Sequence, residues 1–363
     1  MNILVDIGHP AHVHLYKNLC IELKNKGHKV FISVKEIPVA KKLLDFYGLN
    51  YLNIGVKKDS LLSKALNQLS YNFQILRLVQ KNKIDIALGT SITNAHVSKL
   101  TKMQSIIFDD DDDEVQPLFV KYAHPFCDAL LSPDVLTGKR KRKDTICYPG
   151  YHELAYLYPK RFTPDPTVLT EIGLKPGDTF FIMRFNVFKA HHDGGIKGLS
   201  LQQKLELVKI LKPHGRILIT TERDIEPELK EYQMPVSPEK AHSLLAFAAI
   251  LLGDSQTMTS EAAVLGIPSL RCNSFAGRIA YLEEEEKRYG LTYGFVPEQF
   301  NELKQKLSEL LNTPNLRDEF QKRRQKLVND KIDVSAFMLW FVENFPKSKS
   351  LIKNEPEFWN QFK

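Results

Sequence analysis

Short apolar segments alternate with amphipathic helical segments along the chain, and the whole pattern occurs twice. The apolar runs of the first half are residues 2–7, 30–34, 84–88 and 104–108. The runs of the second half are residues 179–184, 216–220, 249–253 and 268–272. Strands that alternate with helices form parallel sheets with helices on both faces. The sequence therefore predicts an α/β protein with two doubly wound sheets.

A proline-rich segment separates the two halves. Residues 158–176 hold Pro159, Pro164, Pro166 and Pro176 and show little sustained periodicity, which favours a linker. The 363 residues suffice for two domains. We expect a first domain at 1–160, a second at 161–340 and a tail at 341–363. Two Rossmann-like domains of this kind would face each other across a cleft, with ligands at the carboxyl ends of their strands.

The composition excludes several classes of protein. Hydrophobic residues make up 43% and charged residues 26%, the balance of a folded chain. The four cysteines are far apart and form no CxxC pair, so neither a disulfide framework nor a zinc site is indicated. The chain shows no secretory signal and no apolar stretch long enough to span a bilayer, so we expect a cytoplasmic location.

The net charge of +7 indicates an anionic partner. No zinc-finger spacing, RNP-like motif or recognition helix supports nucleic acid. The concentrated basic run at 139–143 is interpreted as a solvated loop, with a phospholipid or nucleic-acid patch as the alternative.

The segment 253–268 is the most informative. It follows an apolar run, passes through small hydroxylated residues and leads into a helix, which we predict to begin at Ser260. Free amide groups at a helix start bind anions such as a diphosphate. The alternative is that Thr259 or Ser260 only caps the helix and that Glu261 only complements its dipole.

The stretch from Thr257 to Pro268 resembles the donor-site motif of GT-B glycosyltransferases and of the related UDP-N-acetylglucosamine 2-epimerases. In those families a Ser/Thr/Gly loop precedes a helix that carries a Glu and ends in Gly-x-Pro. The resemblance implies that Glu261 binds the ribose hydroxyls. It implies diphosphate or nucleotide contacts for Ser255, Thr257, Met258, Thr259 and Ser260.

Three histidines follow the first predicted strand, in Gly8-His9-Pro10-Ala11-His12-Val13-His14. Imidazole can remove a proton from a sugar hydroxyl, so His12 is the first candidate for a catalytic base and His9 the second. Ordinary histidines at a helix start are the alternative. The spacing scatters the three rings and disfavours a metal site. The loop is similar to the one that opens the acceptor domain of the lipid-linked N-acetylglucosaminyltransferase of peptidoglycan synthesis, although a second His replaces the usual Gly-rich run.

Six acids, residues 109–114, follow another predicted strand. We weigh a solvated loop against a role in the cleft for Asp109 or Asp110, and Asp110 is the third catalytic candidate. The epimerase motif His-Val-Glu-Ala-Gly is absent from the chain, which argues against epimerase chemistry.

Polar residues also follow two strands of the second half. Arg184 is expected to offset the charge of a leaving diphosphate, and Glu222 to frame the nucleotide base. The run 191–193, His-His-Asp, is an unfavourable metal site because adjacent side chains point apart.

Taken whole, the chain is similar to a little-characterised group of bacterial and archaeal GT-B-like proteins. The similarity rests on the opening Gly-His-Pro-x-His, on Gly-Tyr-x-Glu-Leu-Ala-Tyr at 150–156, and on the motif around Glu261. It implies a metal-independent glycosyltransferase without a cofactor that uses a nucleotide-diphosphate sugar, expected to be a UDP-sugar. The acceptor would be a glycan or glycolipid of cell-surface polysaccharide synthesis, with peripheral membrane contact. A 2-epimerase and a non-catalytic nucleotide-sugar-binding protein are the alternatives.

Overall fold

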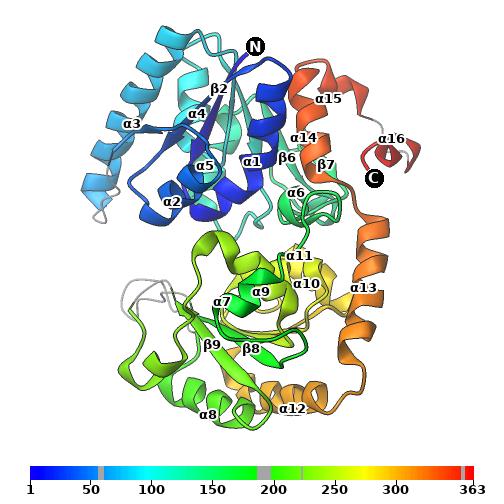
Figure 1. Ribbon diagram of the computed structural model, residues 1–363. Helices are drawn as coiled ribbons and strands as arrows, with labels where there is room; N and C mark the ends of the chain where they lie inside the picture. Colours follow the sequence, from blue (N-terminus) through cyan, green and yellow to red (C-terminus); the bar gives the residue numbers. More distant parts are fainter. Residues whose placement is uncertain (56–60, 186–197, 222–223, 353–355) are drawn as a thin grey trace. The chain divides into compact units, whose positions relative to one another are not determined.

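The computed structural model describes residues 1–55, 61–185, 198–221, 224–352 and 356–363 (Figure 1). The chain forms two compact units. Unit 1 comprises Met1–Arg161 together with Lys331–Lys363, and unit 2 comprises Phe162–Asp330. Among the described residues, no helix has the length and apolarity that crossing a membrane requires.

Unit 1 is built on a parallel sheet with the strand order β3-β2-β1-β4-β5-β6-β7. Its strands are β1 (Asn2–Ile7), β2 (Lys29–Val34), β3 (Leu52–Asn53), β4 (Ile86–Leu88), β5 (Gln104–Phe108), β6 (Ala129–Pro133) and β7 (Ile146–Tyr148). The central strands are mostly apolar because both faces of the sheet are covered. Ile3, Leu4 and Val5 of β1, for example, are fully buried.

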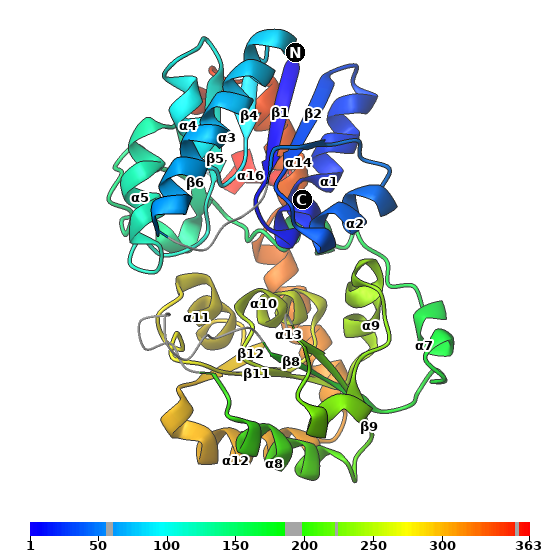
Figure 2. The same ribbon diagram turned by 90° about the vertical axis from the view of Figure 1, so that its left-hand side faces the viewer.

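Helices cover both faces of this sheet (Figure 2). The first part of the chain supplies α1 (Pro10–Asn25), α2 (Pro38–Phe46), α3 (Leu61–Asn82), α4 (Ile92–Ser98), α5 (Pro117–Tyr122), α6 (Leu154–Leu157) and the short 3-10 turns η1 (His124–Phe126) and η2 (Asp134–Leu136). Helices α3 and α4 pack together with η1 on one face, whereas α1 packs with α2 and α6 on the other.

The C-terminal segment belongs to unit 1, which corrects the expected division at residue 340. Helices α14 (Val334–Glu343), α15 (Ser348–Leu351) and α16 (Pro356–Asn360) follow the second unit in sequence. Phe337, Met338 and Phe341 of α14 are fully buried, and α14 packs on α1 and α6. The residues expected to form a tail therefore complete the core of the first unit.

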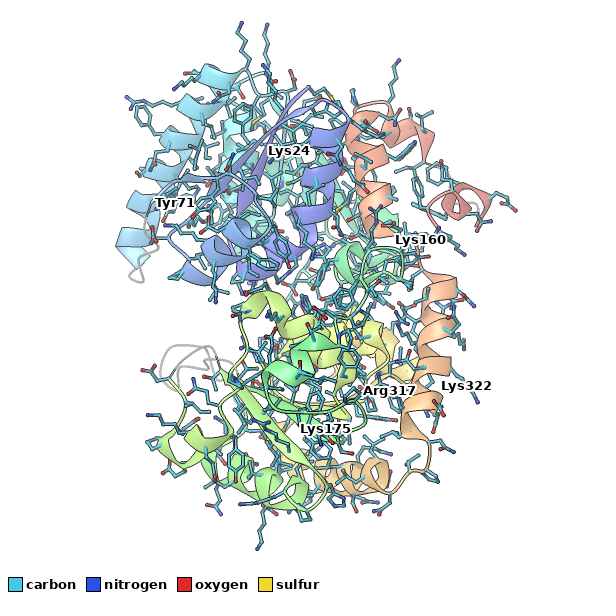
Figure 3. All side chains as sticks on the ribbon, in the orientation of Figure 1. Lys24, Tyr71, Lys160, Lys175, Arg317 and Lys322 are labelled. Atoms are coloured by element: carbon cyan, nitrogen blue, oxygen red, sulfur yellow. The ribbon has the colours of Figure 1, made fainter. Side chains whose placement is uncertain are left out.

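Unit 2 has its own parallel sheet, with the order β12-β11-β10-β8-β9. The strands are β8 (Phe180–Phe185), β9 (Arg216–Thr221), β10 (Ile250–Gly253), β11 (Ser269–Cys272) and β12 (Thr292–Phe295). The helices are α7 (Thr167–Glu171), α8 (Leu201–Leu211), α9 (Ala241–Phe247), α10 (Gln256–Leu265), α11 (Ala280–Lys287), α12 (Phe300–Leu311) and α13 (Leu316–Asp330), with 3-10 turns η3 (Pro227–Tyr232), η4 (Pro238–Lys240) and η5 (Pro297–Gln299). Side chains fill the space between helices and sheet (Figure 3). The predicted pair of doubly wound α/β sheets is confirmed.

A glycine ends the strand beside the point where the strand order reverses in each sheet. Gly89 follows β4 with φ +139°, and a Cβ there would lie 2.7 Å from the carbonyl oxygen of Asp6 on β1. Gly253 ends β10 with φ +154°, and its Cβ would lie 1.9 Å from the carbonyl oxygen of Arg184 on β8. Only glycine fits both the backbone angle and the close approach. Ligands of such sheets bind beside this reversal, outside the carboxyl ends of the strands.

Candidate functional site

Asp6 fixes the loops around the strand reversal of unit 1. Its carboxylate is 2% exposed and accepts hydrogen bonds from Ser33 Oγ at 2.7 Å and from Ser91 Oγ at 2.5 Å. Ser91 Oγ also accepts from the backbone N–H of Asn94 and so caps α4. The buried carboxylate thus ties β1 to β2 and to the start of α4, which makes the carboxyl edge of this sheet rigid.

His9 and His12 lie at the start of α1. The helix begins at Pro10, two residues before His12, where the helical spacing of apolar residues predicts its start. His9 is the N-cap, and its Nδ1 accepts the N–H of Ala11 at 3.2 Å. His12 Nδ1 accepts the N–H of Gly8 at 3.3 Å. Burial lowers the pKa of His12 to about 3, and the charges of His9 and His152 act in the same direction. A neutral His12 with an accepting Nδ1 carries its proton on Nε2, so it offers a hydrogen-bond donor rather than a base.

His14 does not join these two rings. It is buried on the inner side of α1, and its ring lies 5.4 Å from that of Tyr156 and 6.1 Å from that of Tyr47. His14 therefore acts as part of the packing between α1, α2 and α6.

The acidic run after β5 is folded around a buried arginine, so the interpretation of a solvated loop is wrong. Arg140, which is 3% exposed, contacts Asp113 Oδ1 at 2.7 Å and Asp109 Oδ2 at 3.2 Å. Asp109 also accepts from His124 Nε2 at 2.8 Å and from the amide of Gln116. Arg140 comes from the basic run at 139–143, so the two oppositely charged runs neutralise each other in part.

Asp110 pairs with a residue that the sequence did not single out as a site residue. His152 Nδ1 lies 3.0 Å from Asp110 Oδ2, with both side chains mostly buried. The opposite nitrogen, His152 Nε2, is buried and has no hydrogen-bond partner among the described residues. A carboxylate that accepts from Nδ1 leaves Nε2 as the proton acceptor, which is the orientation of a general base. His152 lies in the segment 150–156 but at the unspecified position of that motif, so the motif gave no signal for this residue.

The charges of the pair shift the pKa values of the two groups in opposite directions. Burial alone would lower the pKa of His152, but the negative charge of Asp110 and the hydrogen bond to it raise that pKa above 6.5. Burial alone would raise the pKa of Asp110, but the charge of His152 and the same hydrogen bond bring it below 3.8. At acidic pH the pair is therefore charged, with Asp110 ionised and His152 protonated. His152 loses its proton at a pH above the usual range for histidine.

Asp111 is a second titratable group beside this pair. Its burial and the negative charges of Asp110 and Asp109 raise its pKa to about 7. Ligand oxygens of Asp109, Asp110 and Asp111 lie within 4.8 Å of one another. Asp111 is therefore a carboxyl group of this cluster that takes up a proton near neutral pH.

In unit 2, helix α10 begins directly after β10, at Gln256 rather than at Ser260. The cap is Ser255, whose Oγ accepts the N–H of Met258 at 3.3 Å. The amides of Gln256 and Thr257 form the first turn, and both residues are half-buried. A helix start with free amides at the carboxyl edge of a sheet is suited to an anion.

Four of the predicted contacts, Thr257, Met258, Thr259 and Ser260, therefore lie inside the helix instead of in a loop. Met258 is buried. Thr259 Oγ1 donates to the carbonyl of Ser255 at 2.7 Å, and Ser260, fully buried, donates to Glu285 Oε1 at 2.5 Å. Hydroxyls that are satisfied in this way stabilise the packing of α10, and this placement does not support the predicted phosphate contact of Ser260.

Glu261 follows Ser260 on α10. Its Oε1 is 2.9 Å from His242 Nε2 of α9, and both side chains are nearly buried. The hydrogen bond fixes the carboxylate between α9 and α10. A fixed carboxylate at this place is compatible with acceptance of hydrogen bonds from hydroxyl groups.

Two arginines lie near the carboxyl edge of the sheet of unit 2, Arg184 on β8 and Arg271 on β11. Arg184 Nη1 donates to Thr220 Oγ1 at 3.1 Å, so its guanidinium leans toward β9. Glu222 and the run 191–193 lie outside the described residues. The sequence analysis missed Arg271, which is 1% exposed and pairs with Gly253 in the strand register. Burial lowers its pKa, and Nη1 makes a long contact of 3.5 Å to Asn273 Oδ1.

A family model described as "Protein of unknown function (DUF354)" matches residues 1–290. The chain belongs to the DUF354 family. Curated proteins give no match of comparable significance. The similarity of this family member to characterised proteins is therefore found in its fold.

Solved structures similar to this DUF354 protein include UDP-N-acetylglucosamine 2-epimerases and glycosyltransferases. A putative UDP-N-acetylglucosamine 2-epimerase from Listeria monocytogenes has a TM-score of 0.69 at 13% identity, over 95% of this chain and 96% of that one. The epimerase from Neisseria meningitidis bound to UDP-N-acetylglucosamine has 0.65 at 14%, over 96% and 100%. A spinosyn rhamnosyltransferase with its aglycone has 0.61 at 14%, over 95% and 100%. The predicted resemblance to GT-B glycosyltransferases and 2-epimerases is confirmed, and at these identities it establishes the fold.

Proposed function

We propose that this DUF354 protein is a glycosyltransferase that moves a sugar from a nucleotide-diphosphate donor, expected to be a UDP-sugar, to an acceptor hydroxyl. The observation that carries the proposal is the Asp110–His152 pair at the carboxyl edge of unit 1, with a 3.0 Å contact that leaves His152 Nε2 as proton acceptor. Transfer to a hydroxyl requires such a base.

Unit 2 would bind the donor. The amides of Gln256 and Thr257 and the capped turn at Ser255 form an anion site at the start of α10. They suit the diphosphate, and Arg184 would add positive charge as that group leaves. Glu261, which His242 holds in place, would accept the ribose hydroxyls. Amides and arginines stabilise the leaving diphosphate without a metal ion.

Unit 1 would bind the acceptor and activate it. The acceptor hydroxyl donates its proton to His152 Nε2 while its oxygen forms the bond to C1 of the sugar, and the bond from C1 to the diphosphate oxygen breaks. Asp110 stabilises the imidazolium that results. His12, neutral at physiological pH, orients the acceptor by donating from Nε2. The base thus moves from the predicted His12 to His152, and Asp110 keeps a role beside it.

Binding of the donor is tested with Glu261→Ala. Calorimetry with UDP should give an affinity that is roughly ten- to hundredfold weaker than that of the unaltered protein, because a charged hydrogen-bond acceptor is lost. Glu309→Ala, on the exposed side of α12, is the matched control and should bind UDP normally. Unchanged UDP binding in Glu261→Ala would remove the donor site from the proposal.

The reaction is tested by incubation of the protein with nucleotide sugars and a panel of glycan and glycolipid acceptors. Release of nucleotide diphosphate that requires both an acceptor and His152 supports transfer. Exchange of the C2 proton with deuterated water in the absence of an acceptor would instead identify a 2-epimerase. Tight UDP binding without any turnover would identify a non-catalytic nucleotide-sugar-binding protein.

A further inference from the structure

Among the residues that the structure describes, the exposed large apolar side chains are confined to unit 1. Twelve large hydrophobic side chains are exposed among the described residues, and all twelve belong to unit 1. Six of them lie on α3, α4, α5 and the turns that follow these helices. They are Leu69, Phe73, Leu100, Leu118, Tyr122 and Phe126, with exposed fractions from 39% to 70%. We call the outer surface of these helices the α3–α5 face.

Helix geometry gathers these side chains on one surface. Leu69 and Phe73 are one turn apart on α3, and Leu118 and Tyr122 are one turn apart on α5. Tyr71, labelled in Figure 3, belongs to the same helix α3 but is only 7% exposed, because it packs in the core beneath. The apolar residues of the α3–α5 face are therefore additional to those that the core requires.

His96 of α4 connects the two sides of this face. Its Nδ1 lies 3.5 Å from Asn72 Nδ2 of α3, and its Nε2 lies 2.8 Å from the carbonyl oxygen of Tyr122. Its ring also lies 5.1 Å from that of Phe126. In this way α4 bridges α3 and α5, and Figure 2 shows the ribbons of the three helices on the same side of the sheet of unit 1.

Positive charges predominate on the α3–α5 face, although the acidic run at 109–114 precedes α5 and its last residue, Glu114, is exposed. From residue 68 to residue 108 the sequence holds five lysines and arginines and a single acid, Asp85, which accepts the backbone N–H of Asn2. Residues 115–127 add Lys121 and no acid. Asp128 follows at the edge of the face, where Lys99 neutralises it at 2.8 Å.

Cations and aromatic rings are paired on the face. The guanidinium of Arg77 lies 4.1 Å from the ring centre of Phe73, and the ammonium of Lys121 lies 5.3 Å from that of Tyr122. Aromatic rings settle at the level of lipid headgroups, and cations above them meet the phosphates. Nucleic acid would use the cations but gives no role to exposed leucines such as Leu69 and Leu118.

We propose that the α3–α5 face docks unit 1 on the surface of a membrane that contains anionic phospholipid. The apolar side chains enter the headgroup boundary, and the cations hold the protein to the negative surface. This inference does not depend on the reaction proposed above, because none of its residues belongs to the candidate site.

The test is sedimentation of the full-length protein with vesicles of phosphatidylcholine alone or of phosphatidylcholine mixed with phosphatidylglycerol. We expect binding to the anionic vesicles only, and weaker binding at high salt. Arg77→Gln with Lys121→Gln should lower the partition coefficient roughly tenfold or more. Leu69→Ser, Phe73→Ser and Leu118→Ser together should also lower it, because less apolar area enters the bilayer.

Matched controls come from elsewhere on the surface. Lys209→Gln with Lys212→Gln removes two exposed charges from unit 2, and Phe46→Ser removes an apolar side chain that is 58% exposed on α2. Both should bind vesicles as the unaltered protein does. If the triple variant melts at a lower temperature, Leu118→Ser alone, at a position 66% exposed, replaces it.

Two results would overturn the proposal. One is equal binding to neutral and anionic vesicles, or none to either. The other is binding that depends on Arg77 and Lys121 but not on the leucines and Phe73, because this would indicate simple adhesion to a polyanion. Duplex DNA, titrated under the same conditions, shows whether nucleic acid is that polyanion.

Discussion

In both units a glycine ends the strand beside the point where the strand order reverses. The residues that follow at the carboxyl edge of the sheet differ in their chemistry between the two units. In unit 1, Gly89 leads to a carboxyl edge where His152, Asp110 and Asp111 have shifted pKa values. In unit 2, Gly253 leads to a helix start that Ser255 caps. A backbone amide donates at every pH, whereas a base must change its protonation state. Under the proposed function, one parallel-sheet plan would support binding in one unit and proton transfer in the other.

The surfaces differ as well as the sites. Unit 1 holds every exposed large apolar side chain among the described residues. It also holds both tryptophans of the chain, Trp340 and Trp359. Tryptophan fluorescence therefore reports the unfolding of unit 1 alone, while circular dichroism reports both units. This makes the comparison open to direct measurement.

The largest expected effect is on the proposed transfer. His152→Ala should lower kcat about a hundred- to ten-thousandfold, since the acceptor loses its base, while UDP binding by calorimetry stays unchanged. His214→Ala, exposed in unit 2, should change neither. A loss of UDP affinity in His152→Ala would contradict the separation of binding and proton transfer.

The pH dependence sharpens the assignment of the base. Because Asp110 raises the pKa of His152, kcat/KM should rise with pH through a value above 6.5, where the imidazole becomes neutral. Asp110→Asn removes the charge that raises this pKa, so the rising limb should move to lower pH while the maximal rate falls. Rate profiles of the two proteins provide the measurement. A limb at the same pH in both would exclude His152 as the titrating group.

The next largest effect concerns the buried charges of unit 1. Arg140→Met leaves Asp109 and Asp113 buried without their arginine, which should lower the free energy of unfolding by about 3–5 kcal/mol. Urea unfolding followed by tryptophan fluorescence measures it. Arg288→Met breaks ion pairs of a side chain that is 51% exposed in unit 2, and there urea unfolding followed by circular dichroism should show a change below about 1 kcal/mol.

The two glycines allow the units to be separated. Gly89→Ala and Gly253→Ala each force a Cβ against a neighbouring strand, at 2.7 Å and 1.9 Å, and should each cost at least about 2 kcal/mol. Gly89→Ala should shift the fluorescence transition, whereas Gly253→Ala should shift only the dichroism. Gly138→Ala, with φ +77° and open space around it, measures the backbone strain alone. A fluorescence shift in Gly253→Ala would show that the units unfold together.

The sequence predicts what depends on local pattern. Alternation of apolar runs indicated both sheets, and the small residues after β10 indicated the anion site. It did not predict β7 or β12, because β7 follows a charged run and β12 contains Thr292 and Gly294, so neither forms an extended apolar run. Nor did it place α14, whose pairing with α1 is a contact between distant segments.

The same limit applies to the site. Ser260 was predicted as a helix start because serine and threonine favour caps, yet Glu285 satisfies its hydroxyl inside the helix. His152 and Arg140 meet Asp110 and Asp113 only through the folding of unit 1. The local sequence shows which types of residue are present. The partner that shifts a pKa or neutralises a charge is brought into contact only by the tertiary structure.

The smallest expected effect distinguishes a cap from a binding site. Ser255 caps α10 and Ser200 caps α8, each by accepting the N–H three residues ahead. Ser255→Ala and Ser200→Ala should therefore each lower stability by about 1 kcal/mol, measured by circular dichroism. Only Ser255→Ala should also weaken UDP binding, because the turn it holds presents the amides of Gln256 and Thr257. If both variants bound UDP as the unaltered protein does, Ser255 would be a cap and nothing more, and the donor site would have to lie elsewhere along the edge of unit 2.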